Sequence, residues 1–219
     1  MKQISNYIIE KLSLNNVEVK KETTKNYFPE TEDQLTKILI DLFKERGKNA
    51  NLNDIDTSKI KNMSCLFYNL KKYNNCEYAA IDISEWDVSN VTEMDEMFRD
   101  CEEFDCDLAT WNVSKVESMY GMFLNCKNFE GNGLRYWELD NCRNTKSMFM
   151  NCELFNEDIS NWQFRENGCD CDYMFWGCKN FNRNLESWNY KRIGKKTLMF
   201  KDCDKLKKKP SWYKKSRRD

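Results

Sequence analysis

The sequence contains no histidine among its 219 residues, and it has only two prolines and seven glycines. The absence of histidine excludes Ser-His and Cys-His catalytic pairs and every imidazole metal ligand. So few glycines leave little from which to build a glycine-rich phosphate loop. No apolar run is long enough to span a bilayer, and the first residues lack the apolar stretch of a secretory signal. These absences favour a protein that is not an enzyme and has no membrane span.

The composition is otherwise that of a folded chain. Hydrophobic residues make up 40% and aromatic residues 14%, enough to fill a core. Charged residues make up 32%, but the formal net charge is only −1, so no global field points to nucleic acid or membrane. The length suits one domain of ordinary size or one elongated array.

Cysteine is unusually frequent, with 11 residues. A disulfide framework is typical of a short secreted chain with an even number of cysteines. This chain is long, the number is odd and no export signal is visible, so we expect reduced thiols and an intracellular location. A processed or truncated chain is the alternative.

Tryptophan recurs at a nearly fixed interval, and other residues recur with it. Six of the seven tryptophans are separated by 25, 26, 25, 26 and 24 residues: Trp86, Trp111, Trp137, Trp162, Trp188 and Trp212. A Met-Phe pair follows each of the first five: Met97-Phe98, Met122-Phe123, Met148-Phe149, Met174-Phe175 and Met199-Phe200. A cysteine stands three residues after each of these phenylalanines: Cys101, Cys126, Cys152, Cys178 and Cys203. A weaker earlier copy has Ile55 in place of tryptophan.

A period near 25 residues is typical of a solenoid, in which each repeat buries its apolar face only against its neighbours. Leu134-x-x-Trp137-x-Leu139-x-x-Cys142 fits the leucine-rich-repeat template. The alternation of Trp111 and Val113 predicts a strand, and the three- and four-residue steps that follow predict a helical or 3₁₀ return. We therefore predict an α/β solenoid: a leucine-rich-repeat-like parallel sheet with short helical or 3₁₀ returns.

The ends of the array have their own sequence features. Thr31 and Gln34 form a capping box before an apolar helical stripe, and Gly47 is the expected C-terminal cap. We predict an N-terminal arm over 1–26, an N-terminal helical cap over 27–51, about six repeats over 52–206 and a basic C-terminal tail over 207–219. Residues 7–12 are expected to form a short amphipathic helix, and residues 68–80 hold an insertion.

Asp82 through Phe98, with the pattern D-I-S-x-W-D-V-S-N-V-T-x-M-x-x-M-F, resembles the BspA-like leucine-rich repeats. The resemblance covers about residues 27–206, and residues 27–58 are similar to the capping region that often precedes such repeats. It implies the solenoid fold. Exported members of that family are surface adhesins, which makes adhesion one alternative for this chain. Residues 1–12 also look like short N-terminal segments of proteins encoded by gut tailed phages, which implies a virion-associated location.

We expect no catalytic residue, cofactor or metal. Cysteine packs as a small hydrophobe in a buried ladder, and the sequence has no pair of C-x-x-C clusters for a structural zinc. A cysteine nucleophile would need a base, and none is recognisable without histidine.

The residues on either side of each tryptophan are expected to point outward from the sheet and to bind a protein partner: Glu85, Asp87, Thr110, Asn112, Tyr136, Glu138, Asn161, Gln163, Ser187 and Asn189. We call these ten residues the tryptophan-flanking row. The leading prediction is a non-enzymatic solenoid for protein–protein interaction or scaffolding.

Charge is uneven along the chain. From Asp82 to Asp107 there are eleven acidic residues and one basic, whereas from Lys205 to Asp219 there are eight basic and one acidic. The basic tail consists of Lys207, Lys208, Lys209, Lys214, Lys215, Arg217 and Arg218. A soluble terminal cap is the favoured interpretation of the tail. The alternative is contact with nucleic acid, as in a phage or virion-associated cargo protein.

Overall fold

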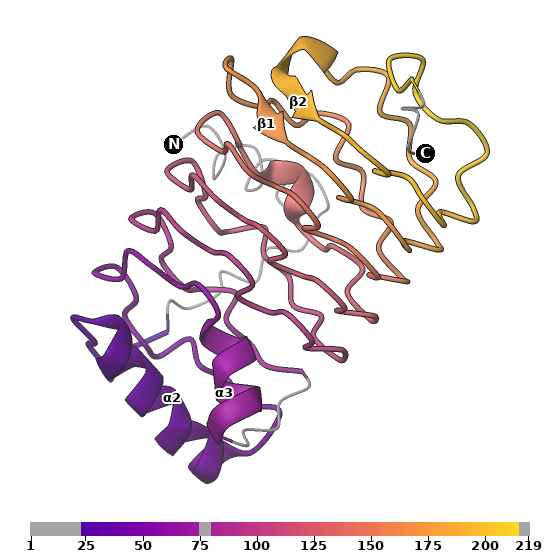
Figure 1. The fold of residues 1–219 in the computed structure, drawn as a ribbon. Coiled ribbons are helices and arrows are strands. Elements are labelled where there is room, and N and C mark those ends of the chain that lie inside the picture. The colour runs from indigo at the N-terminus through magenta and orange to yellow at the C-terminus, as the bar shows by residue number, and fades with distance from the viewer. Residues whose placement is uncertain (1–22, 75–79, 215–219) are drawn as a thin grey trace, which may run out of the picture.

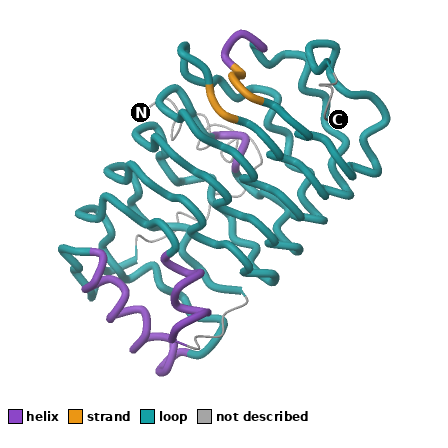
Figure 2. The backbone as a smooth tube through the Cα atoms, in the orientation of Figure 1, coloured by secondary structure: helices purple, strands orange, loops and turns teal. Residues whose placement is uncertain are grey.

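The computed structural model describes residues 23–74 and 80–214. The helix expected at 7–12 lies outside the described residues, as do most of the N-terminal arm and the insertion residues 75–79. Successive turns of the backbone lie side by side in one row, from helix α2 at the N-terminal end to the C-terminal residues at the other (Figure 1). Most of the chain in this row is loop and turn (Figure 2).

Regular elements are few and short. They are α2 (Glu32–Arg46), α3 (Leu66–Asn74), the 3₁₀ helices η1 (Leu134–Tyr136) and η2 (Tyr190–Arg192), and the strands β1 (Cys169–Asp170) and β2 (Ile193–Lys195). Strands β1 and β2 pair in parallel. Isolated parallel bridges extend this pairing through the row: Asn62 with Glu93, Glu93 with Ser118, Ser118 with Asn144, and Asn144 with Asp170.

The parallel pairing lies in a different part of the repeat from the part that the sequence indicated. We predicted a strand at Trp111 to Val113 and a helical return over the Met-Phe segment. Within the described residues, that segment carries two isolated parallel bridges, Tyr27 with Ile55 and Leu139 with Phe164. The regular pairing between neighbouring repeats begins at the bridge residues and runs through the Met-Phe segment. The prediction of where strand and return lie was therefore wrong.

Backbone donors explain why this segment pairs. The N–H groups of Phe123 and Asn125 donate to the carbonyls of Met148 and Met150 in the next repeat, at 2.9 and 2.8 Å. The intervening Leu124 N–H donates back to Gly121 O at 3.0 Å. Alternate N–H groups thus join neighbouring repeats while the others close tight turns. Every buried backbone donor along this stretch needs such a partner, and both kinds of bond satisfy that need without a regular strand.

These turns place the same positions of each repeat in the left-handed region. The φ angles of Asp100, Asn125, Asn151, Gly177 and Asp202 lie between 56° and 79°. Asp, Asn and Gly are the residues that adopt this conformation at least cost.

The core is a set of aromatic columns, as the repeat predicted. The rings of Trp111 and Trp137 stack at 6.4 Å with an interplanar angle of 2°. Phe123 stacks on Phe98 at 5.5 Å and on Phe149 at 5.7 Å. The phenylalanines of the five Met-Phe pairs are buried, and so are Trp86, Trp111, Trp137, Trp162 and Trp188. Trp162 stacks on Trp188 at 6.3 Å, so indoles of neighbouring repeats align along the row in these pairs.

Helix α2 closes the N-terminal end. The Thr31 hydroxyl accepts from the Gln34 N–H at 3.2 Å, and the Gln34 side chain accepts from the Glu30 N–H at 2.7 Å, so the capping box is confirmed. Gly47 ends the helix with φ 73° and donates to Phe43 O. The buried face consists of Leu35, Leu39, Leu42 and Phe43. Helix α3 begins where the Ile55 repeat has Leu66-Phe67 and continues into the insertion.

The C-terminal end of the row carries aromatic side chains as well as the expected charges. Trp212 stacks on Trp188 at 6.2 Å, and its indole donates to Leu185 O at 2.9 Å. Tyr213 is buried, with its ring edge on Phe200 at 5.1 Å. These two rings cover the last phenylalanine of the columns.

Candidate functional site

All ten residues of the tryptophan-flanking row are exposed or half-buried, while the five tryptophans that they flank are buried. The predicted alternation of a buried tryptophan with outward-pointing neighbours is therefore present. The row does not lie on a continuous sheet, because the regular pairing is elsewhere in the repeat.

Many side chains of this row stabilise the protein itself. Thr110, Asn161 and Ser187 each donate to a backbone carbonyl of the preceding repeat, namely those of Ser84, Arg135 and Ser160. Asp87, Asn112 and Asn189 each accept from the backbone N–H two residues later. Such side-chain bonds hold turns. The Glu85 carboxylate also accepts from the Thr23 N–H at 3.3 Å, so at least seven of the ten side chains bond within the chain, while Glu138 and Gln163 are exposed.

The paired Met-Phe segments present a second surface, which sequence reasoning missed. One position after the laddered phenylalanine, the side chains form a column that we call the ladder face: Arg99, Leu124, Met150, Trp176 and Lys201. The first four are half-buried and Lys201 is exposed. The sequence did carry a signal for this surface, because three large apolar residues recur at a position next to the buried phenylalanine. We assigned the segment to a helical return, in which these side chains would not line up between repeats, so the surface was not predicted.

Cations and rings meet at the C-terminal half of the ladder face. The Lys201 ammonium lies 4.2 Å from the centroid of the Trp176 ring. Tyr173, half-buried, lies with its ring 5.8 Å from that of Trp176, and Lys146 lies 5.6 Å from the Tyr173 centroid. The Trp176 indole N–H donates to Asp202 at 2.8 Å. These contacts hold a large aromatic surface in a fixed orientation between two lysines.

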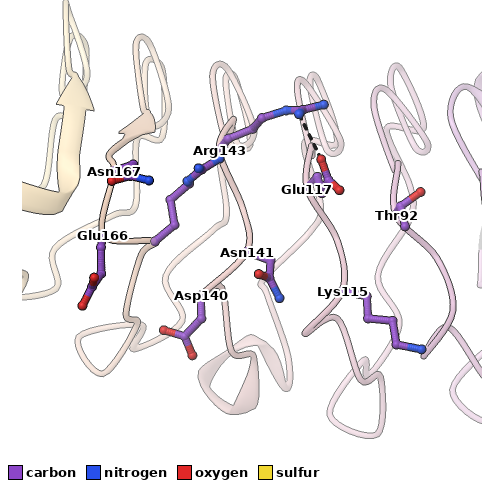
Figure 3. A pocket seen from close by; sticks show the side chains of 9 residues that line it. Thr92, Lys115, Glu117, Asp140, Asn141, Arg143, Glu166 and Asn167 are labelled. Atoms are coloured by element: carbon purple, nitrogen blue, oxygen red, sulfur yellow. Dashed lines mark ion pairs between the residues drawn. The ribbon is translucent and has the colours of Figure 1, made fainter.

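An open cleft of about 670 Å³ is lined by residues that follow the tryptophan segments of four repeats (Figure 3). Its walls are almost entirely polar: Thr92, Lys115, Glu117, Asp140, Asn141, Arg143, Arg165, Glu166 and Asn167. Arg143 pairs with Glu117 at 2.9 Å and with Glu93 at 3.5 Å. Burial and the neighbouring carboxylate of Asp95 raise the pKa of Glu93, while Arg143 opposes that shift. The charges of the cleft are mixed and largely paired, which suits hydration better than a dedicated ligand.

A second cleft, of about 420 Å³, lies at the C-terminal end of the row. It is lined by four cations, Arg183, Lys205, Lys207 and Lys208, together with Glu186. The Glu186 carboxylate accepts from the Ser211 backbone and hydroxyl at 2.8 and 2.7 Å, which lowers its pKa. Of the predicted basic tail, Lys207 and Lys208 line this cleft. Lys209 lies 5.1 Å from the Tyr213 ring centroid, and Lys214 is exposed. Lys215, Arg217 and Arg218 lie outside the described residues.

The laddered cysteines are buried donors. The thiols of Cys126 and Cys152 donate to the carbonyls of Phe98 and Phe123 at 2.9 Å, and Cys178 repeats the contact with Phe149 at 3.0 Å. Burial raises the pKa of all three thiols. A protonated thiol is a poor nucleophile. The ladder thus acts in packing and hydrogen bonding.

The residues 23–74 and 80–214 contain no group of three or more Cys, Asp or Glu side chains placed to hold a metal ion. Within the same residues, no helix has the length and apolar character needed to cross a membrane. The expectation that the protein is not an enzyme stays a prediction.

The comparison with known proteins gives a family but no function. The model of the family described as "Mycoplasma protein of unknown function, DUF285" matches residues 37–162 and, in a second overlapping match, residues 107–213. Neither a curated protein nor a solved structure matches the chain. The double match agrees with the internal repeat, because one family model fits two registers of the same chain. The chain belongs to the DUF285 family, whose members are described as proteins of unknown function.

Proposed function

We propose that this chain is a non-enzymatic scaffold that binds another protein, and that it is a solenoid of the BspA-like leucine-rich-repeat kind. The fold part of the proposal is supported by the parallel bridges at one-repeat intervals and by the stacked aromatic columns. The binding part is supported by one observation above others. This is the half-exposed apolar column of the ladder face, formed by Leu124, Met150 and Trp176.

The chemistry of this column fits a protein surface. Trp, Tyr and Met are enriched at protein–protein interfaces. The three side chains come from successive repeats, so they form a continuous strip across the row. A partner that covers the strip removes apolar area from water. Lys146 and Lys201 lie beside the rings, so the complementary partner carries a carboxylate next to its apolar side chains.

Binding to two matched variants tests the proposal. Tagged protein captures the partner from a lysate of the native host, and the purified partner is then titrated against each variant. The double variant Met150→Ala, Trp176→Ala is expected to raise the dissociation constant at least tenfold, because truncating an interface hot spot costs about 2 kcal/mol or more. The control is Tyr136→Ala with Glu138→Ala, from the tryptophan-flanking row.

Each outcome assigns the surface. Loss of affinity only in the ladder-face variant supports the proposal. Loss only in the control variant moves the binding surface to the tryptophan-flanking row. Unchanged affinity in the ladder-face variant, with an unchanged melting temperature, removes the ladder face as the binding surface.

A second candidate function is binding of a phosphate-bearing partner at the C-terminal end. The cleft lined by Arg183, Lys205, Lys207 and Lys208 favours it, because four cations meet there beside one carboxylate that already has partners. Titration of a single-stranded oligonucleotide at several salt concentrations tests this function. The triple variant Lys205→Gln, Lys207→Gln and Lys208→Gln is expected to bind more weakly. The slope of the logarithm of the binding constant against the logarithm of the salt concentration is expected to become shallower by about 0.7 for each lost phosphate contact. Binding that does not depend on salt excludes this function.

A further inference from the structure

The repeat pattern changes at one place in the core. The bridge residue of the regular pairing is Glu93 in the Trp86 repeat and Ser118 in the Trp111 repeat. The buried positions on either side of it hold valine and methionine: Val91 with Met94, and Val116 with Met119. In the next two repeats the same positions hold Cys142 with Thr145, and Cys169 with Cys171. Four apolar side chains are thus replaced by three thiols and a hydroxyl. Packing alone does not require that change, because the earlier repeats fill these positions with apolar side chains.

These four side chains are in contact with one another inside the core. The Thr145 hydroxyl lies 3.5 Å from the Cys169 sulfur and 3.3 Å from the Cys171 sulfur. Asn144 bridges Asp170, and the Asp170 N–H donates to Arg143 O at 2.9 Å, so Cys169 lies alongside the Cys142–Arg143 backbone of the preceding repeat. All four of Cys142, Thr145, Cys169 and Cys171 have 0% exposure. We call Cys142, Cys169 and Cys171 the thiol cluster.

A local irregularity staggers two of these cysteines between neighbouring repeats. Equivalent side chains of a regular parallel stack point the same way, so a bridge between them would distort the stack. The Trp162 repeat has one extra residue before its Met-Phe pair, and the pairing of β1 with β2 shifts register between Cys169 and Asp170. Cys142 stands two residues before its bridge residue, whereas Cys169 stands only one before Asp170. The two thiols therefore meet at an offset instead of in parallel.

The thiol cluster differs from the laddered cysteines in what its thiols contact. Cys126 and Cys152 donate at 2.9 Å to carbonyls of the preceding repeat, which fixes each sulfur away from its neighbour. The carbonyl contacts of Cys142 and Cys169 are longer, 3.5 and 3.8 Å. Within the cluster, hydrogen bonds from Cys142, Cys171 and Thr145 lower the pKa of the Cys169 thiol against the opposing effect of burial, and the pKa values of Cys142 and Cys171 are raised. Cys169 is therefore the thiol that loses its proton first and becomes the nucleophile.

We propose that Cys142 and Cys169 form a reversible disulfide that joins the Trp137 repeat to the Trp162 repeat, with hydrogen peroxide as the oxidant. The Cys169 thiolate attacks one peroxide oxygen and breaks the O–O bond, which gives a Cys169 sulfenic acid and, after proton uptake, one water. The Cys142 sulfur then attacks the Cys169 sulfur, the S–O bond breaks, and the hydroxyl leaves as a second water with the Cys142 proton. Two thiols lose two electrons and one peroxide gains them. Peroxide is small and neutral, which suits entry to a buried cluster.

Peptide mapping of the folded protein tests the assignment. The native chain is treated with hydrogen peroxide, its remaining thiols are alkylated, and it is digested with trypsin. We expect the loss of two thiols per chain and a cross-link between peptides 136–143 and 166–179, which dithiothreitol reverses. Fragmentation is expected to place the bond on Cys169 and not on Cys171 or Cys178.

Three variants make the result decisive. Cys142→Val installs the side chain that earlier repeats have at this position, so it is expected to fold and to abolish the cross-link. Cys171→Ser and the ladder control Cys152→Ser are expected to keep it. The proposal is overturned if peroxide treatment leaves every thiol of the wild-type protein free. It is also overturned by a bond between Cys169 and Cys171, or by a cross-link that survives Cys142→Val.

Discussion

The indole N–H of Trp162 donates a hydrogen bond to the carbonyl of Leu134 at 2.8 Å, across the boundary between two repeats. The same bond joins Trp111 to Ile83 and Trp188 to Ile159. Tryptophan recurs in this chain because it both fills the core and satisfies a buried carbonyl of the preceding repeat. A phenylalanine would fill much of the same space but would lose this second bond to the Leu134 carbonyl, which also accepts from the Trp137 N–H at 3.0 Å.

Trp162→Phe is therefore expected to destabilise the protein. The Leu134 carbonyl keeps the Trp137 N–H but loses its second donor, which costs about 0.5–1.5 kcal/mol, and the smaller ring adds a cavity. Urea unfolding followed by circular dichroism measures the change. Trp212→Phe is the matched control, because its indole makes the same bond to Leu185 from a half-buried position at the end of the row. If the two variants lose equal stability, burial of the carbonyl is not the cause.

The left-handed positions of the Met-Phe segment give a second test. Asn151 has φ 61°, and its side-chain amide donates to Asn125 Oδ1 at 2.8 Å. Asn151→Ala removes the side-chain bond and leaves a β-carbon in a disfavoured conformation, so we expect a loss of about 1–3 kcal/mol. Asn151→Gly removes the same bond but accepts the backbone, and it is expected to lose less. Thermal melts of the two variants compare them, and a glycine variant less stable than the alanine variant contradicts the backbone argument.

The buried columns could be predicted from the sequence, whereas the backbone pairing could not. The columns of Trp111, Phe123 and Cys126 were predictable because identical apolar residues at a fixed interval have one common way to be buried. The location of the pairing was not, because it depends on which backbone N–H groups need partners, and side-chain periodicity does not report that. Asp100, Asn125 and Gly177 did mark the turns, since they tolerate positive φ. The ladder face was missed for the same reason: a segment assigned to a helical return does not align its outward side chains into a column.

The N-terminal helix gives a third test. The Thr31 hydroxyl accepts from the Gln34 N–H at 3.2 Å at the start of α2. Thr31→Ala is expected to cost about 1 kcal/mol, because it leaves an orphan donor at the helix end. Thr31→Ser keeps the acceptor and is expected to be nearly neutral. Urea unfolding of the two variants measures the difference, and equal loss in both would mean that the cap does not stabilise α2.

The buried thiols predict how stability depends on pH. Burial raises the pKa of Cys203 to about 12 and that of Cys106 to about 11, from an ordinary value of 9.0. In the unfolded chain these thiols lose their protons near pH 9, whereas in the folded chain they keep them to higher pH. Above pH 9 the unfolded state thus binds fewer protons than the folded state, so the free energy of unfolding falls as pH rises. The stability that depends on these protonated thiols is therefore fully present below pH 9 and is lost by about pH 12.

Urea unfolding between pH 8 and 11 measures this fall, and a ladder variant isolates its cause. Burial also raises the pKa of Cys178, whose thiol donates to Phe149 O. Cys178→Ala removes one titrating thiol, so the variant is less stable than wild type at pH 8 but loses less stability between pH 8 and 11. The gap between the two proteins should therefore narrow with rising pH. A gap of constant size would mean that the laddered thiols do not titrate on unfolding, and would assign the alkaline loss to lysine and tyrosine side chains instead.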